Sequence, residues 1–530
     1  QGRVKGYKHP ELDIFTFRGV PYAEEPKGRD KFKAPLPPTP WTGTLDAVSS
    51  NNCPQFLLSF MDFDNINCLV ANIFIPKTDA VNLPVVIFIH GGGFFGGGGD
   101  WQQPITLVNS KRVVAVTINY RLGVHGFLCL GTENVPGNAG MKDQVAAIRW
   151  VKENIAKFGG NPNSITLAGS SGGAMSVNLH LLSKMSRGLF QKAIPDSGSS
   201  ISPFTPQQDP MEDAKKFASR LSSDLNVDDL KALEEFYLQA SINELSKPIL
   251  EINPDYSLMF SPCIERDTGT ERFLEASPYS IIKSGNYSKL PKLEGFATFE
   301  GLLNKLYFDK FFPEMNADFS NFLPTDLHFE SKEQKDEVAR TVKRFYFGER
   351  EIGPDTAIEF VKYFSDIGFT YSILRSVKLH LETGLDTIYL YEYAFVDDNT
   401  SEVPYTNIKG AEHASQTEAI YDTTQFKNTT KEFEQMKKSM QELYLNFITD
   451  GYSTDSVPAW PKVNKFNSPY MLLNQTSSLQ TSMLQSRFEL WDKIYEKHYH
   501  EPQPPSNSGL CVHSSLITVI VLCVVIIMIK

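Results

Sequence analysis

The residues best suited to chemistry lie in a glycine-rich turn at Gly169–Gly173, which reads Gly-Ser-Ser-Gly-Gly and fits the pattern G-x-S-x-G. The apolar run Ile165–Ala168 before it predicts a short buried strand, and we expect a helix from Ala174 onward. A serine on such a turn is held in a strained conformation with its hydroxyl exposed, beside the positive end of the helix dipole. Ser171 is therefore a candidate nucleophile for acyl transfer. The alternative is a glycine-rich turn whose serine has no role.

A second glycine-rich stretch could stabilise the negative charge that acyl transfer creates. It reads His90-Gly91-Gly92-Gly93-Phe94 and lies between two apolar runs. Consecutive glycines leave backbone N–H groups free to converge on one oxygen, which is what an oxyanion hole requires. We predict this role for Gly92 and Gly93. The alternative is a flexible glycine-rich loop, which is our expectation for Gly96–Gly99.

Strand and helix signals alternate around these two turns. Continuous apolar runs at 83–90 and 113–119 predict strands that are covered on both faces, as in a parallel sheet. Residues 144–158 carry apolar side chains at helical spacing and end at two glycines, which is typical of a helix that packs on a sheet and then stops. The pattern predicts an α/β fold with a mostly parallel central sheet flanked by helices.

Composition limits the kind of partner. The chain has 530 residues, of which 41% are hydrophobic, so it can bury a large core. Its formal net charge is −11 and it has no basic stripe, so we expect no nucleic-acid partner. It begins at Gln1 without an apolar leader, as a mature secreted protein would after removal of its signal peptide, although a trimmed chain would begin in the same way.

Cysteines and glycosylation sequons favour the secretory pathway. Cys53 and Cys68 are close in sequence, with polar and aromatic residues between them, and suit a small disulfide loop. We expect Cys129 and Cys263 to be buried free thiols that pack as small apolar residues. N-x-S/T sequons predict glycosylation at four positions, which are Asn286, Asn399, Asn428 and Asn474.

Three motifs near the N-terminus follow one another in a recognisable order. Residues 17–23 read Phe-Arg-Gly-Val-Pro-Tyr-Ala, residues 26–35 read Pro-Lys-Gly-Arg-Asp-Lys-Phe-Lys-Ala-Pro, and residues 40–43 read Pro-Trp-Thr-Gly. Together with the stretch 137–164, they resemble the type-B carboxylesterases of the carboxylesterase/cholinesterase family, and most of all the insect members. The resemblance covers roughly residues 1–495 and implies an α/β-hydrolase fold with its active site at the bottom of a gorge.

The resemblance also points to the other members of a catalytic triad. Residues 293–303 resemble the strand and turn that carry the family's acid, which falls on Glu300. The order along the chain in this fold is serine, acid and then histidine. His413 lies on a glycine-bounded loop where the family has its base. The other histidines after Glu300 lie in helical, linker or tail segments or on an unmatched polar loop, and they are His328, His380, His498, His500 and His513.

In the reaction that this resemblance implies, Ser171 attacks the ester carbonyl and His413 takes the serine proton and returns it to the leaving alcohol. Glu300 orients His413, and water activated by His413 then cleaves the acyl-enzyme. No metal or cofactor is implied. The oxyanion would be bound by three backbone N–H groups, those of Gly92, Gly93 and Gly172.

The chain departs from the family pattern near the expected site. Ser170 and Gly172 stand where the family usually has glutamate and alanine, so a charge near the acyl site is lost while the N–H of Gly172 is kept. The loop between Cys53 and Cys68 carries Phe56, Phe60 and Phe63 but no tryptophan, which cholinesterases use in this loop to bind the choline cation. We therefore expect substrates other than choline esters.

Polar pairs of the family are also changed. Asn65-Ile66-Asn67 replaces Ser-Glu-Asp, and Lys31 replaces the arginine that pairs with that glutamate. Asn161 replaces an aspartate that pairs with the arginine matched by Arg121, so we expect Asn161 to accept a hydrogen bond from Arg121. Ser197 matches a serine that supports the family's triad, with simple packing at a strand end as the alternative.

The C-terminal end differs in kind from the rest of the chain. We expect a carboxylesterase domain at 1–500, a Pro/Ser-rich linker at 501–515 and a hydrophobic tail at 516–530. Leu516–Ile529 is an apolar run of 14 residues. As a helix it would span about 21 Å, which is short of the ~30 Å hydrocarbon core of a membrane. With the small residues 506–509 before it, the tail favours a GPI-attachment signal over a short tail anchor.

Two functions are compatible with these patterns. The first is a serine carboxylesterase that acts on small-molecule esters, outside the cell or on its surface. The second is a non-catalytic recognition or adhesion protein on the same fold, of the kind found among membrane-tethered members of the superfamily, which typically lack a triad residue. Because Ser171, Glu300 and His413 are all present, the sequence favours the enzyme.

Overall fold

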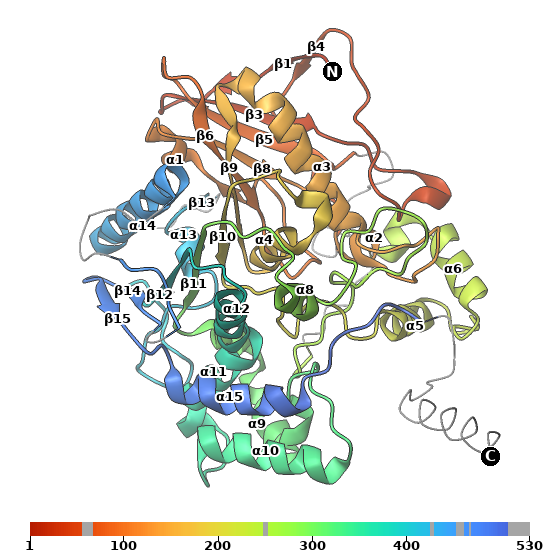
Figure 1. The fold of residues 1–530 in the computed structure, drawn as a ribbon, viewed down its shortest axis with the longest axis vertical. Coiled ribbons are helices and arrows are strands. Elements are labelled where there is room, and N and C mark those ends of the chain that lie inside the picture. The colour runs from red at the N-terminus through yellow and green to blue at the C-terminus, as the bar shows by residue number, and fades with distance from the viewer. Residues whose placement is uncertain (56–66, 247–252, 424–428, 452–459, 466–467, 507–530) are drawn as a thin grey trace, which may run out of the picture.

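A sheet of 11 strands runs through the centre of the molecule (Figure 1). It belongs to a computed structural model that describes residues 1–55, 67–246, 253–423, 429–451, 460–465 and 468–506, and all structural statements refer to these residues. From one edge to the other, the strands are β15 (Ser478–Gln480), β14 (Tyr470–Leu473), β12 (Ile388–Tyr393), β11 (Lys292–Ala297), β10 (Lys192–Asp196), β9 (Gly160–Ser170), β6 (Leu83–Ile89), β8 (Val114–Ile118), β5 (Val70–Pro76), β3 (Ile14–Pro21) and β2 (Tyr7–Lys8).

The middle of this sheet is parallel, as the apolar runs predict. Every pairing from β8 across to β14 is parallel, and the antiparallel pairings lie toward the two edges. Parallel strands all end at the same edge of a sheet, so the turns that follow β6, β9, β10 and β11 come close together there. The α/β-hydrolase expectation of a mostly parallel sheet flanked by helices is confirmed.

Helices cover both faces of the sheet, which explains why the central strands are apolar throughout. Along β6, Val85 and Ile87 belong to the core on one face, whereas Val86 and Phe88 belong to the core on the other, because successive side chains point to opposite faces. Helices α3 (Ala139–Asn154) and α4 (Gly172–Leu182) cover the first face. Helices α1 (Ile105–Asn109) and α14 (Lys431–Asp450) cover the second (Figure 1).

Further α-helices and the 3₁₀ helix that carries Glu300 complete the fold, and four of them, α9, α10, α11 and α15, gather at the end of the molecule opposite the N-terminus (Figure 1). They are α2 (Gly123–Phe127), α5 (Pro210–Leu221), α6 (Leu230–Gln239), α7 (Ile242–Leu245), α8 (Pro278–Ser284), the 3₁₀ helix η5 (Glu300–Tyr307), α9 (Phe308–Ala317), α10 (Lys332–Phe347), α11 (Ala357–Ser365), α12 (Tyr371–Glu382), α13 (Ser415–Glu418) and α15 (Gln485–His498). Two small sheets pair β1 (Arg3–Lys5) with β4 (Thr44–Asp46), and β7 (Gln102–Gln103) with β13 (Asp422–Thr423).

The helix expected at 144–158 begins earlier, at Ala139, because charged residues in its first turns are buried in ion pairs. Asp143 accepts hydrogen bonds from Arg121 at 2.6 and 2.7 Å, and Lys142 lies 2.5 Å from Glu265. The prediction that Asn161 pairs with Arg121 was therefore wrong. The Asn161 side chain instead accepts the N–H of Asn163 at 2.9 Å.

The structure contains two disulfides. The predicted Cys53–Cys68 bond is confirmed, whereas Cys129 and Cys263, expected to be free thiols, are also bonded to each other. Asn138 brings their segments together, because its side chain accepts the N–H of Cys263 at 2.9 Å and donates to the carbonyl of Cys263 at 2.8 Å. A Cβ at Gly137 would lie 2.7 Å from either sulfur. The disulfide joins residues 134 positions apart, a pairing that local sequence does not reveal.

Several predictions fall on residues that the structure does not describe. They are the phenylalanines Phe56, Phe60 and Phe63, the replacement at Ile66, the sequon at Asn428 and the tail 516–530. The start of the predicted linker is described, and it packs on the body. The Glu501 carboxylate accepts the hydroxyl of Ser280 at 2.6 Å, and Pro502 and Pro505 are buried. No helix among the described residues is both long and apolar enough to cross a membrane.

The second disulfide gives a direct test. We expect non-reducing peptide mapping to recover a Cys129–Cys263 peptide beside the Cys53–Cys68 peptide. Because the bond closes a long loop in the unfolded chain, the double variant Cys129→Ala/Cys263→Ala should lose about 2–5 kcal/mol of stability in a denaturant titration. Alkylation of either cysteine in the native, unreduced protein would contradict the assignment.

Candidate active site

Ser171 lies at the sharp turn between β9 and α4, as the sequence predicts. Its backbone has φ +56° and ψ −124°, a combination that costs energy for a residue with a side chain. Its N–H donates to the carbonyl of Asp196 at 2.9 Å, which fixes the turn to the end of β10. The neighbouring Gly173 is required, since a Cβ there would lie 2.1 Å from the carbonyl oxygen of Ile89. The close approach of the backbones excludes side chains at Gly169 and Gly173, and the Ser170 hydroxyl is bonded to Thr417. Ser171 therefore carries the side chain that projects into the cavity.

The glycine loop after β6 faces this turn. Gly92 and Gly93 have φ values of +102° and +58°, which glycine adopts without strain. A Cβ on Gly172 would lie 3.3 Å from the backbone nitrogens of both Gly93 and Phe94, so amides of the loop and of the turn surround one spot. Among the described residues, the N–H groups of Gly92, Gly93 and Gly172 have no hydrogen-bond acceptor. This arrangement suits an oxyanion hole.

The loop is held by its surroundings more firmly than its composition indicates. Gly96–Gly99, expected to be flexible, is buried, and Gln55 makes two hydrogen bonds to the backbone of Gly97, at 2.8 and 3.0 Å. His90 stacks on Tyr120 at 4.4 Å and bonds the carbonyl of Gly91 through Nδ1 at 2.8 Å. Burial lowers the pKa of His90 to about 4, so it stays neutral near pH 7. The hydrogen bonds from Gln55 and the stacking of Tyr120 on His90 therefore hold the glycine loop in one conformation.

Glu300 and His413 are hydrogen-bonded to each other, through Oε2 of the carboxylate and Nδ1 of the ring. Glu300 follows β11 at the start of η5 and is fully buried. Its other oxygen, Oε1, accepts the backbone N–H of Ala297 at 2.7 Å and the hydroxyl of Ser197 at 2.5 Å. Both carboxylate oxygens are thus matched by donors, as a buried carboxylate requires.

Ser197 is in turn held by a residue that sequence reasoning missed. Gln416 lies in α13, three positions after His413, and donates from Nε2 to the hydroxyl oxygen of Ser197 at 2.6 Å. Because Ser197 accepts this bond, its single proton is free to be donated to Glu300. Of the two alternatives for Ser197, the structure favours support of Glu300 over simple packing at a strand end. The only sequence signal for Gln416 was its position beside the base.

The next residue of α13 connects to the nucleophile turn. Thr417 donates its hydroxyl to that of Ser170 at 2.8 Å, and both residues are buried. Helix α13 therefore links the loop of His413 to the acid through Gln416 and to the turn through Thr417. The His413 ring also packs against Phe369, and the centroids of the two rings are 4.4 Å apart. The bond to Glu300, the contacts of α13 and the packing against Phe369 together hold His413 in place.

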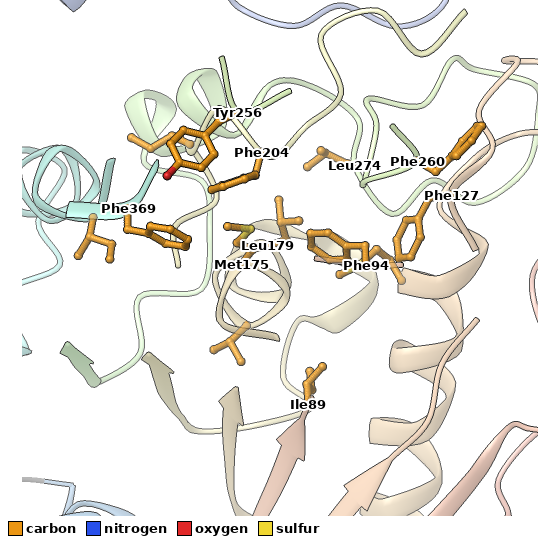
Figure 2. Close-up of a cluster of buried hydrophobic side chains, with 14 of the residues drawn as sticks. Ile89, Phe94, Phe127, Met175, Leu179, Phe204, Tyr256, Phe260, Leu274 and Phe369 are labelled. Carbon is orange, nitrogen blue, oxygen red and sulfur yellow. The ribbon is translucent and has the colours of Figure 1, made fainter. Parts of the chain in front are cut away.

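One cavity of about 290 Å³ is lined by Ser171 and His413 together with the glycines of the loop and the turn. Its other walls are mostly apolar, and none of the described residues that line it is acidic. Figure 2 shows two of these walls, Phe204 and Phe369, whose rings lie 5.3 Å apart above Met175 of α4. The apolar walls are Phe95, Trp101, Met175, Phe204, Leu258, Leu303 and Phe369.

The other predicted sites are apart from this cavity. Asn286 and Asn399 are exposed and Asn474 is half-buried, and their glycosylation stays a prediction. Lys31 donates to the backbone carbonyls of Leu238 and Ala240. Within the described ranges, no three His, Cys, Asp or Glu side chains are grouped so that they could hold a metal ion.

A serine at a strained turn between a central parallel strand and the helix after it, with a buried acid and a histidine beyond later strands, defines an α/β-hydrolase. The sequence agrees over nearly its whole length. Residues 1–491 match the family model described as the carboxylesterase family, and the chain belongs to that family. It is thus a carboxylic ester hydrolase by class, as the N-terminal motifs predicted.

Relatives and a solved structure support this assignment. The chain is 30% identical over 515 residues to esterase FE4 of Myzus persicae, covering 92% of this chain and 89% of that protein. It is 33% identical over 414 residues to a juvenile hormone esterase of Tribolium castaneum, covering 73% and 70%. The crystal structure of a juvenile hormone esterase from Manduca sexta, with OTFP covalently attached, superposes with a TM-score of 0.80 at 26% identity and covers 93% of this chain and 97% of that chain.

The bond from Ser197 to Glu300 can be tested against a matched control. Loss of a hydrogen bond to a charged group costs roughly 1.5–3 kcal/mol, so Ser197→Ala should lower kcat for ester hydrolysis about 10- to 100-fold. KM should change little, because Ser197 does not line the cavity. The control is Ser199→Ala, which removes an equally buried hydroxyl that donates to the carbonyl of Ser372 instead. Equal losses in both variants would show that the effect is structural.

Proposed function

We propose that the protein is a serine carboxylesterase that works through an acyl-enzyme intermediate, with Ser171 as nucleophile, His413 as general base and acid, and Glu300 as the residue that orients His413. The observation that carries this proposal is the position of His413. Its ring is bonded to the buried Glu300 and lines the same cavity as Ser171. This is the relation among the three groups that acyl transfer needs.

The chemistry follows from which atoms are already engaged. With Nδ1 bonded to Glu300, Nε2 of His413 is the nitrogen left to accept the Ser171 proton as the serine oxygen bonds to the ester carbonyl carbon. The carbonyl oxygen then carries a negative charge, which the N–H groups of Gly92, Gly93 and Gly172 stabilise. Each such donor is worth roughly 3 kcal/mol in the transition state. The imidazolium protonates the departing alkoxide, which leaves as the alcohol. A water molecule then loses a proton to His413 and attacks the acyl-enzyme carbonyl. The bond to the Ser171 oxygen breaks, the serine regains the proton from His413, and the carboxylic acid is released.

The cavity favours neutral esters with apolar groups. Its walls offer aromatic and aliphatic side chains, and burial of each CH₂ against such walls contributes roughly 0.8 kcal/mol. A quaternary ammonium group would find no carboxylate among the described lining residues. Aromatic rings can also bind such a cation, and Trp101 lines this cavity although the loop between Cys53 and Cys68 has no tryptophan, so the exclusion of choline esters stays a prediction.

We also propose that the protein follows the secretory pathway and is attached to the cell surface through its C-terminal tail. Two buried disulfides suit an oxidising environment, and the small residues 506–509 followed by the apolar run 516–529 fit a GPI-attachment signal. In that case, the exposed side chains of Asn286 and Asn399 are accessible to the glycosylating enzymes of this pathway.

Covalent labelling tests the proposed mechanism. A serine activated by a base and facing an oxyanion hole should react with an organophosphate, whereas an ordinary serine is unreactive near neutral pH. We expect one adduct per chain, located on Ser171 by peptide mass spectrometry. Ser171→Ala should lose both the adduct and ester hydrolysis, and Ser170→Ala, which alters the neighbouring hydroxyl, should keep the adduct.

The other two triad variants set the scale of the effect. His413→Ala should lower kcat by about 10⁶-fold and Glu300→Gln by about 10⁴-fold, because the base is needed more than its orientation. If well-folded protein forms no adduct and hydrolyses none of a panel of p-nitrophenyl esters, the recognition or adhesion function replaces the enzymatic one.

Membrane attachment has its own test. If the tail is a GPI signal, a phosphatidylinositol-specific phospholipase C should release the protein from the surface of expressing cells, and peptides from 516–530 should be missing from the mature protein. Recovery of an intact tail peptide from membrane-bound protein would instead establish a tail anchor.

A further inference from the structure

One face of the 3₁₀ helix η5 leads from the buried acid to the surface. A 3₁₀ helix has three residues per turn, so side chains at positions i and i+3 stand above one another. In η5 these positions are Glu300, Leu303 and Leu306. Their exposed fractions rise along the helix, from 0% to 40% to 87%. The row therefore runs from the triad outward to solvent.

Leu303 connects this row to the cavity that holds Ser171. It lines the cavity, as does Trp101, which is 37% exposed. The other apolar side chains of the lining are buried or half-buried, so we place the mouth of the cavity at Leu303 and Trp101, together with the exposed backbone of Gly92. The three-residue repeat of η5 places Leu306 next to Leu303 on the solvent side. Exposed apolar surface that is continuous with a site marks a place where a ligand binds.

The row is held in place by contacts behind it. Asn304 is buried and donates to the hydroxyl of Tyr256 at 2.5 Å, and the N–H of Gly301 donates to the hydroxyl of Ser365 at 2.8 Å. A preset surface can bind a ligand without the entropic cost of being ordered first. The nearest charge on the helix is neutralised, because Lys305 pairs with Glu412 at 2.5 Å. The mouth thus suits a neutral, apolar ligand.

The size of the cavity indicates which part of a ligand would reach this surface. At about 290 Å³ it lies at the lower end of the range for ligand pockets, roughly 300–1,000 Å³. An ester whose carbonyl is at Ser171 and whose chain is long would fill the cavity before the chain ended. The remainder would have to pass the mouth and lie against the outer part of η5.

We propose that Leu303 and Trp101, at the mouth of the cavity, and Leu306, beyond the mouth, form an apolar subsite that binds the distal chain of a long-chain, neutral ester. This rests on the proposed esterase function and specifies its substrate class. The subsite contributes to chain-length selectivity, since short esters that end within the cavity make no contact with Leu306.

The test compares p-nitrophenyl acetate with p-nitrophenyl decanoate, used below the concentration at which the decanoate aggregates. Leu306→Ser should lower kcat/KM for the decanoate about three- to tenfold, mainly through KM, and should change kcat/KM for the acetate less than twofold. Leu306→Met keeps an apolar side chain and should retain the selectivity. The matched control is Val81→Ser, since Val81 is 79% exposed and does not line the cavity.

The outcomes separate this inference from the proposed function. If the wild-type protein hydrolyses both esters and Leu306→Ser affects them equally or not at all, the subsite is wrong while the esterase stands. If neither ester is hydrolysed, the proposed function fails. Calorimetry then decides whether Leu306 contributes to binding of a long-chain ester. It uses Ser171→Ala, which cannot form the acyl-enzyme. Weaker binding of methyl decanoate when Leu306→Ser is added supports the subsite, and unchanged or absent binding overturns it.

Discussion

A carboxylate that is buried away from water must be matched by hydrogen-bond donors, and much of the site follows from how Glu300 meets that requirement. Its donors come from the end of β11, from Ser197 after β10, and from His413 on a distant loop. Gln416 completes the set by fixing the direction of the Ser197 hydroxyl. The need to satisfy one buried group thereby brings three separate segments of the chain together, and the same contacts orient the His413 ring.

The parallel sheet makes this meeting possible. Its central strands all end at one edge, so the turns after β6, β9, β10 and β11 are neighbours although they are far apart in sequence. At that edge the backbones approach so closely that Gly173 has no room for a side chain beside Ile89. The strain at Ser171 is tolerated because these surrounding contacts leave the turn no alternative.

A neutral residue stands beside Ser171 at a position where the family commonly has a charge. Ser170 stands in place of a frequent glutamate, and it is bonded to Thr417 rather than left unpaired in the cavity wall. The described lining of the cavity has no acidic residue, and most of its side chains are apolar. These features agree with one another, because a neutral, apolar ester requires no compensating charge.

Local sequence determined the central strands, the turn that carries Ser171 and the glycine loop, because each depends on neighbours in the chain. Val85–Ile89 is apolar throughout, and only glycine tolerates the backbone approaches at Gly92 and Gly173. Glu300 and His413 were reached only through resemblance and chain order. Tertiary structure alone decided the Cys129–Cys263 bond, the pairing of Arg121 with Asp143, and the role of Gln416. These three features depend on which distant segments become adjacent when buried polar groups are paired. The periodicity of the chain carries no information about such long-range contacts.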